Sequence, residues 1–147
     1  MVVLSPHIAS MLVVFPITFF NGFWLNRYVA FRRSPLSGMI YSEQLATEIE
    51  LLCQNTKTSS NTLFQLRKSS SSVYANIREA NYGQSKADML SKFEIALKEC
   101  SETEGWLQLL FNTNGIDEET YKYYRNLCGR IRRMLIASCK TLKENAL

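Results

Sequence analysis

Apolar and small residues recur at alternating steps of three and four along two long stretches of the chain, residues 89–110 and 121–142. The first stretch carries Met89, Phe93, Ala96, Cys100, Thr103, Leu107 and Leu110, and the second carries Tyr121, Tyr124, Cys128, Ile131, Leu135, Ser138 and Leu142. This spacing places each set on one face of an α-helix. Because the spacing persists over about three heptads, it is typical of nearly parallel helices packed in a left-handed bundle.

Two further segments have the same periodicity, and no segment alternates like a β-strand. One carries Tyr41, Leu45, Ile49, Leu52 and Cys53, and the other, from about Thr62 to Asn81, carries Leu63, Leu66, Ser70, Val73, Ile77 and Ala80. The sequence therefore predicts an all-α fold. We expect an antiparallel up-down four-helix bundle over residues 39–147, preceded by an apolar N-terminal helical segment.

Polar breaks separate the predicted helices at residues 54–61, 84–85 and 112–115. Gly115 suits a left-handed C-terminal cap, since glycine adopts positive φ without a steric cost. Asp117 is a good N-cap for the last helix, and the two glutamates after it favour the positive end of the helix.

Four consecutive serines, Ser69–Ser72, lie inside the second predicted helix, and Ser70 falls on its apolar face. Small side chains let two helix backbones approach closely, and a serine hydroxyl can bond to the carbonyl one turn back. A phosphorylated or catalytic serine is the alternative, but the only histidine, His7, lies far from this helix in sequence. We therefore interpret these serines as packing residues and predict no catalytic residue.

Residues 1–38 form a different kind of sequence. Residues 8–25 carry no charge and are long enough to be a candidate membrane span. Arginines at positions 27, 32 and 33 follow, and by the positive-inside rule they would keep the rest of the chain cytoplasmic. Residues 34–38, Ser-Pro-Leu-Ser-Gly, predict a linker. We expect an N-terminal extension, 1–38, and a bundle domain, 39–147, in the cytoplasm, or at a membrane if the extension is an anchor.

The cysteines argue against a metal site. Cys53, Cys100, Cys128 and Cys139 include no C-x-x-C pair, and the bundle has no histidine to complete the Glu-x-x-His motifs of a di-iron site. We predict reduced, buried thiols, with no metal and no cofactor.

Basic residues suggest one candidate site. Three of the seventeen basic residues and none of the thirteen acidic ones precede residue 39, so the remainder carries a net charge of +1. Within it, residues 122–143 are rich in Lys and Arg and contain no Asp or Glu. The candidate phosphate contacts are Arg125, Arg130, Arg132, Arg133 and Lys140, together with Arg67, Lys68, Arg78 and Lys86 on or beside the second helix. The alternatives are a solvated helix face, or pairing with Glu43, Glu48 and Glu50.

Polar residues suggest a second candidate site, a buried polar network or an oligomer contact. Asn76 and Glu79 share one face of the second helix, near Ser70, and Glu102 or Glu104 of the third helix could meet them across the bundle.

The stretch SSSSVYANIREANYGQSKADMLSKFEIALKECSETEGWLQLL, from residue 69, closely resembles the signature of the four helix bundle proteins, also called 23S rRNA-intervening sequence proteins. The resemblance spans about residues 41–143. It implies a helical bundle that assembles into a ring-like homo-oligomer, often a pentamer. The family is related to the accessory protein of diversity-generating retroelements, which binds a reverse transcriptase and nucleic acid through a basic surface.

Residues 17–38, ITFFNGFWLNRYVAFRRSPLSG, resemble a fragment of a GtrA-like membrane protein. Three interpretations stay open: a chimeric reading frame, a real membrane anchor, or an apolar arm that packs on the bundle. For the whole chain, we expect a non-enzymatic homo-oligomeric scaffold that binds nucleic acid or a protein partner through its Arg-rich fourth helix. The alternative is a membrane-tethered protein-interaction module.

Overall fold

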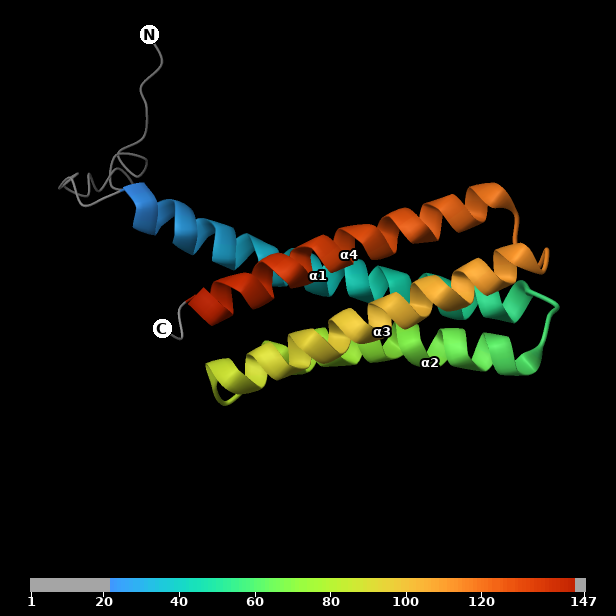
Figure 1. Ribbon diagram of the computed structural model, residues 1–147, viewed down its shortest axis with the longest axis horizontal. Helices are drawn as coiled ribbons and strands as arrows, with labels where there is room; N and C mark the ends of the chain where they lie inside the picture. The colour runs from blue at the N-terminus through green and yellow to red at the C-terminus, as the bar shows by residue number, and fades with distance from the viewer. Residues whose placement is uncertain (1–21, 145–147) are drawn as a thin grey trace, which may run out of the picture.

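The computed structural model describes the backbone of residues 22–144 and the side chains of residues 38–144. It consists of four helices, α1 (Gly22–Asn55), α2 (Ser60–Ala80), α3 (Lys86–Asn112) and α4 (Glu118–Glu144) (Figure 1). The described part of the chain contains no strand. Short connections join successive helices, so neighbours in sequence run antiparallel. The predicted all-α bundle is confirmed.

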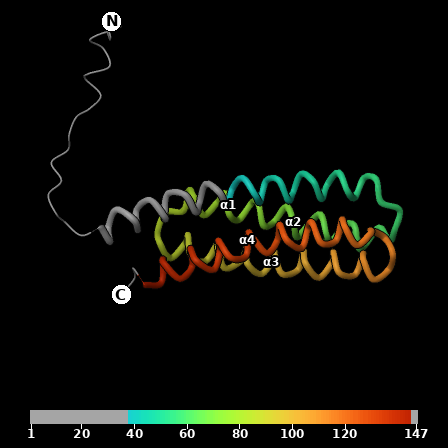
Figure 2. The backbone as a smooth tube through the Cα atoms, turned by 90° about the horizontal axis from the view of Figure 1, so that it is seen from above, coloured from blue at the N-terminus to red at the C-terminus, as the bar shows by residue number. Residues whose placement is uncertain are grey.

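The four helices lie along one common axis, and each contacts two others. α1 packs on α2 and α4, and α3 packs on α2 and α4, whereas α2 and α4 occupy diagonal positions without direct contact between them (Figures 1 and 2). This arrangement leaves each helix with one face toward the core, two flanks toward its neighbours and one face toward solvent.

The apolar faces predicted from the sequence supply the core. Buried apolar residues include Leu45, Ile49, Leu66, Val73, Ile77, Phe93, Ala96, Cys100, Leu107, Leu110, Tyr124, Cys128, Ile131, Leu135 and Leu142. The remaining apolar members of these faces, such as Leu63, Met89 and Tyr121, are half-buried and pack against that core.

The first serine of the run, Ser69, packs α2 against Thr103 of α3. Ser69 and Ser70 are both buried, and their hydroxyls donate to the carbonyls of Leu66 and Arg67, three residues back. On α3, Thr103 places its hydroxyl 3.0 Å from that of Ser69 and donates to its own helix at Glu99. Each buried hydroxyl is therefore satisfied without a charged partner, as the packing interpretation requires. That interpretation is confirmed for Ser69 and Ser70 but is wrong for Ser71, which is exposed.

Ser70 and Ser71 offer a test of this packing, because only the first is buried. Ser70→Leu forces extra volume between α2 and its neighbours, and we expect it to lower the free energy of unfolding by about 2 kcal/mol. Ser71→Leu, on the exposed side of the same helix, is the matched control and should leave stability nearly unchanged. Urea denaturation followed by circular dichroism measures both. Equal losses for the two variants would contradict the packing role of Ser70.

The linker predicted at residues 34–38 is not present, because α1 continues through it. Gly38 is already buried in the bundle, and a Cβ at this position would lie 3.9 Å from Ile77 Cγ2 of α2. Pro35 removes one helix hydrogen bond but does not end the helix. The domain boundary at residue 38 stays a prediction.

Most of the apolar segment at residues 8–25 lies outside the described residues, and α1 begins at Gly22. Within residues 22–144, no helix has the length and apolar character needed to cross a membrane.

The C-terminus of α3 is capped by a residue other than the predicted one. Asn114 has the left-handed conformation, with φ 55°, and Gly115 does not. Hydrogen bonds from Asn114 N–H to Phe111 O (3.0 Å) and from Gly115 N–H to Leu110 O (2.8 Å) form a Schellman motif. Gly115 instead lets the chain turn back close to the end of α3, because a Cβ there would lie only 3.2 Å from Leu110 O. The next helix begins as predicted, with Asp117 Oδ1 accepting from Thr120 N–H at 2.7 Å.

Asn114 should therefore tolerate glycine but not alanine. Asn114→Ala places a Cβ in the left-handed region, and we expect it to lower the free energy of unfolding by about 1 kcal/mol. Asn114→Gly relieves the same constraint and should leave stability unchanged or slightly higher. Thermal and urea unfolding of the two variants measure this difference. Alanine as stable as glycine at this position would rule out the assigned cap.

Candidate nucleic-acid interface

The four arginines of α4 have different surroundings. Arg132 forms an ion pair with Glu104 of α3, with Nη1 2.5 Å from Oε2. Arg130 lies over the ring of Tyr41 on α1, with its guanidinium carbon 5.9 Å from the ring centroid. These two arginines fasten α4 to its two neighbours, and their charges are already engaged within the bundle.

Arg125 and Arg133 are exposed, and neither has an acidic or aromatic partner within residues 38–144. The lysines of this helix do have acidic neighbours. Lys122 pairs with Glu118 (2.6 Å), Lys140 approaches Glu144 (3.9 Å), and Lys143 pairs with Glu94 of α3 (2.8 Å). Three arginines of α4 thus lack an acidic partner among residues 38–144, and of these Arg125 and Arg133 also lack an aromatic one.

The basic residues of α2 lie apart from this face. Arg67 Nε is 3.2 Å from Glu50 Oε2 of α1, which realises one of the predicted pairings with the acids of the first helix. Arg78 donates to the hydroxyl of Tyr74 at 2.9 Å. Lys68, and Lys86 at the start of α3, are exposed without an acidic partner among the described residues. Since α2 and α4 are diagonal, one protomer does not combine the basic residues of these two helices into one surface.

The polar residues predicted to form a network make separate contacts. Asn76 donates to Ser72 O at 2.9 Å, within its own helix. Glu79 pairs with Lys92 of α3 at 2.6 Å. Glu102 approaches Lys98 on its own helix at 3.9 Å, and Glu104 pairs with Arg132. Ser70 is buried between helices. The structure thus brings neither Glu102 nor Glu104 to Glu79, and a role of these residues in an oligomer contact stays a prediction.

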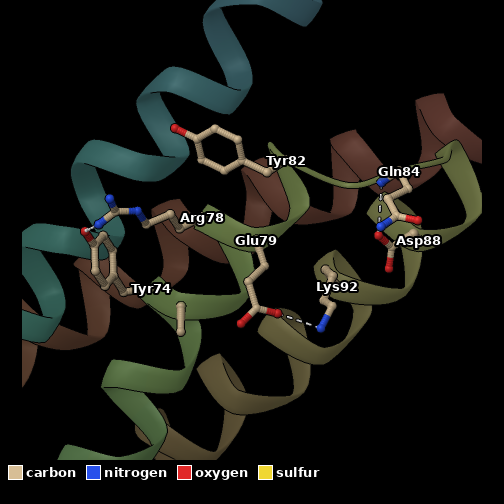
Figure 3. Close-up of a pocket in the computed structure, with 8 residues that line it drawn as sticks. Tyr74, Arg78, Glu79, Tyr82, Gln84, Asp88 and Lys92 are labelled. Atoms are coloured by element: carbon tan, nitrogen blue, oxygen red, sulfur yellow. Dashed lines mark hydrogen bonds and ion pairs between the residues drawn. The ribbon is translucent and has the colours of Figure 1, made fainter.

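An open hollow of about 500 Å³ lies beside the α2–α3 connection (Figure 3). Its lining residues are Tyr74, Ala75, Arg78, Glu79, Tyr82, Gln84, Asp88 and Lys92. The Glu79–Lys92 ion pair crosses its floor, and Asp88 Oδ2 accepts from Gln84 N–H at 3.3 Å. Asp88 also belongs to the α3 cap, because its N–H donates to Ser85 Oγ. Of the charged groups of the hollow, Glu79 and Lys92 therefore pair with each other, whereas Arg78 and Asp88 bond to uncharged partners.

The comparison with protein-family models identifies the fold's relatives. The model of the 23S rRNA-intervening sequence protein matches residues 39–137. The chain belongs to this family. A similar crystal structure is that of a protein of unknown function from the S23 ribosomal protein family of Bacteroides thetaiotaomicron. It is 36% identical, covers 73% of this chain and 98% of its own, and superposes with a TM-score of 0.70. No curated protein matches the chain.

The family match confirms the resemblance carried by the residues from Ser69 onward, which form most of α2 and α3. The family model begins at residue 39, so it does not include the GtrA-like segment at residues 17–38. That second resemblance, and the relation to the retroelement accessory protein, stay predictions.

All four cysteines of this family member are free and buried, as predicted. A hydrogen bond to Cys100, together with burial, raises the pKa of the Cys128 thiol. Burial also raises the pKa of Cys53 and of Cys139. Raised thiol pKa values disfavour the thiolate that nucleophilic or metal-binding chemistry requires. Within residues 22–144, no three His, Cys, Asp or Glu side chains gather as a metal site would need.

Two contacts between α1 and α4 were missed by reasoning from sequence. The Tyr123 hydroxyl donates to Glu48 Oε2 at 2.9 Å, and Gln44 Nε2 donates to the same hydroxyl at 3.1 Å. Tyr124, on the core side, is buried and lies 3.4 Å from Glu48 O. A glutamate one turn from a glutamine on α1 was the available signal, but nothing in the sequence showed that α4 would face it.

The buried Tyr124 predicts a stability loss at alkaline pH. Burial raises its pKa from 10.0 to about 12. Between these values the unfolded chain releases a proton that the native state keeps, so the free energy of unfolding falls as pH rises. Urea denaturation from pH 9 to 11.5 should show a steeper decline for wild type than for Tyr124→Phe. Tyr82→Phe, which removes an exposed hydroxyl, is the matched control. Parallel curves for wild type and Tyr124→Phe would contradict the assignment.

Proposed function

We propose that this protein is a non-enzymatic, homo-oligomeric scaffold that binds the backbone of nucleic acid through the outward face of α4. The observation that carries the proposal is the pair of exposed arginines, Arg125 and Arg133, without acidic partners in the described part of the chain. Exposed guanidinium groups that are not neutralised internally are the ordinary means of binding phosphates. Membership of the 23S rRNA-intervening sequence family is compatible with this function and does not by itself assign it.

A binding role is favoured over a catalytic one by the state of the nucleophiles. The hydroxyls of Ser69, Ser70 and Ser71 donate to carbonyls of their own helix. The four thiols are buried, and in the hollow beside the α2–α3 connection Glu79 pairs with Lys92 and Asp88 accepts from the Gln84 N–H. None of these groups has the adjacent base that activates a nucleophile.

Assembly of several copies is supported by apolar residues on the outward faces. Phe64 of α2 and Leu109 of α3 are 59% and 40% exposed. Both lie one to two turns from the Ser69–Thr103 contact, on the same side of it, because the helices are antiparallel. Ile40 and Leu51 are similarly exposed on α1. Repetition of the α4 face around a ring would multiply weak phosphate contacts into useful affinity.

The proposal predicts a multimer with salt-dependent affinity for nucleic acid. Light scattering on the full chain should give a mass several times 16.9 kDa. Fluorescence anisotropy with labelled oligouridine and oligothymidine should show log affinity falling linearly with log salt, with a slope of about −0.7 per phosphate contact on a single strand. Lys98→Ala, which removes an exposed lysine of α3, is the control and should leave both results unchanged.

The two parts of the proposal fail separately. A monodisperse monomer would exclude the homo-oligomer, and affinity that does not change with salt would exclude the phosphate contacts. No measurable binding to either oligonucleotide at 50 mM salt would exclude nucleic acid as the ligand, leaving a protein partner as the better interpretation.

A further inference from the structure

Gly129 occupies an unusual position in α4. It lies one turn from both Arg125 and Arg133, on the side of the helix away from the core, and yet it is buried. Arg133 explains the burial, because its Nη1 lies 3.5 Å from the point where a Cβ of residue 129 would be. The guanidinium of Arg133 therefore rests across the backbone at Gly129, where a longer side chain would keep it away.

The glycine is not needed for contact between helices. Among residues 38–144, and apart from the chain neighbours and backbone of its own helix, only Arg133 has an atom within 4 Å of the absent Cβ of residue 129. Glycine in the interior of a helix is destabilising relative to alanine. Because glycine has no side chain, position 129 leaves room for the guanidinium of Arg133 close to the helix surface.

Arg133 differs from the other three arginines of α4 in what holds it. Arg132 is held by Glu104 and Arg130 by the ring of Tyr41. Arg125 has no such contact among residues 38–144. Arg133 lies over the backbone of its own helix at Gly129 and keeps its charge unneutralised. A guanidinium is a planar fork of five N–H donors, and a fork that is already oriented loses less conformational freedom when it binds two phosphate oxygens.

We propose that Arg133, lying over Gly129, is the principal phosphodiester contact of the α4 face, that Arg125 is a second contact, and that Arg130 and Arg132 are positioning residues. This inference rests on the proposed function and refines it. Arg125 and Arg133 are eight residues apart, about 12 Å along the helix. They would therefore contact non-adjacent phosphates of one strand. Contacts of this kind read no bases, so binding should not depend on nucleotide sequence.

Paired substitutions test the roles of Arg133 and Gly129. Arg133→Ala should weaken binding of oligouridine by about tenfold and reduce the steepness of the salt dependence by about 0.7. Gly129→Gln keeps every charge but occupies the place where the guanidinium lies, and it should weaken binding about threefold. Gly105→Gln is the matched control on α3, because no atom beyond its chain neighbours and its own helix backbone lies within 4 Å of its missing Cβ. It should leave affinity unchanged.

Arg132→Ala separates a positioning role from direct contact. It should lower the melting temperature through loss of the Glu104 pair, and it should change the salt dependence less than Arg133→Ala does. Arg133→Lys should recover the salt dependence but only part of the affinity, since it restores the charge without the planar fork. Oligouridine, oligoadenosine and oligothymidine, measured in parallel, should give the same ranking of variants.

The outcomes distinguish this inference from the proposed function. Wild-type binding that Arg133→Ala and Gly129→Gln both leave intact would overturn the role of this pair and keep nucleic-acid binding. Equal losses from Gly129→Gln and Gly105→Gln would also overturn it, because the effect would then be one of helix stability. Absence of binding by the wild type at low salt would remove the proposed function itself. Circular dichroism melts confirm that each variant compared is folded.

Discussion

The close approach of α2 and α3 at Ser69 and Thr103, beside the buried Ser70, sets the alignment of these two helices in the bundle. Small side chains remove the volume that would keep the helices apart, and each hydroxyl bonds to a carbonyl of its own helix. The layer is therefore polar in composition without leaving a buried group unsatisfied. It also fixes how the two antiparallel helices are aligned, and that alignment brings Glu79 opposite Lys92 at the far end. The shape of the hollow beside the α2–α3 connection follows from this alignment.

Periodicity predicted the core well because burial depends on the face of a helix, and the face depends only on spacing. Every apolar residue of the predicted faces is buried or half-buried. Spacing does not say which neighbouring helix a flank will meet, so the contacts of charged residues were harder to predict. Glu79 met a lysine of α3 instead of a glutamate, and Glu104 met α4. The pairing of Arg67 with Glu50 could be predicted, because the two residues lie on successive helices joined by a short connection.

Local signals failed where packing outweighed them. Ser-Pro-Leu-Ser-Gly is a linker by composition, but Gly38 is buried beside Ile77, and the helix continues through the segment. At the end of α3, the choice between Asn114 and Gly115 could not be made from residue type, because both tolerate positive φ. In the structure, Asn114 takes the left-handed conformation. Gly115 instead lies so close to Leu110 that there is little room for a Cβ.

The distribution of charge explains why one face of α4 differs from the other surfaces. Residues 39–55 of α1 contain three acids and no base, and α3 has five acids against three bases. α2 has three bases and one acid, and α4 has seven bases and three acids. Each basic helix therefore lies between two acidic ones, and the flanks neutralise one another through pairs such as Arg132–Glu104 and Lys143–Glu94. The excess of basic residues on α4 is too large for the neighbouring helices to neutralise all of its positive charge. The remaining positive charge lies on Arg130, whose contact on α1 is the ring of Tyr41, and on the outward face that carries Arg125, Gly129 and Arg133. A nearly neutral bundle can thus present a local positive surface, which the net charge of the chain does not reveal.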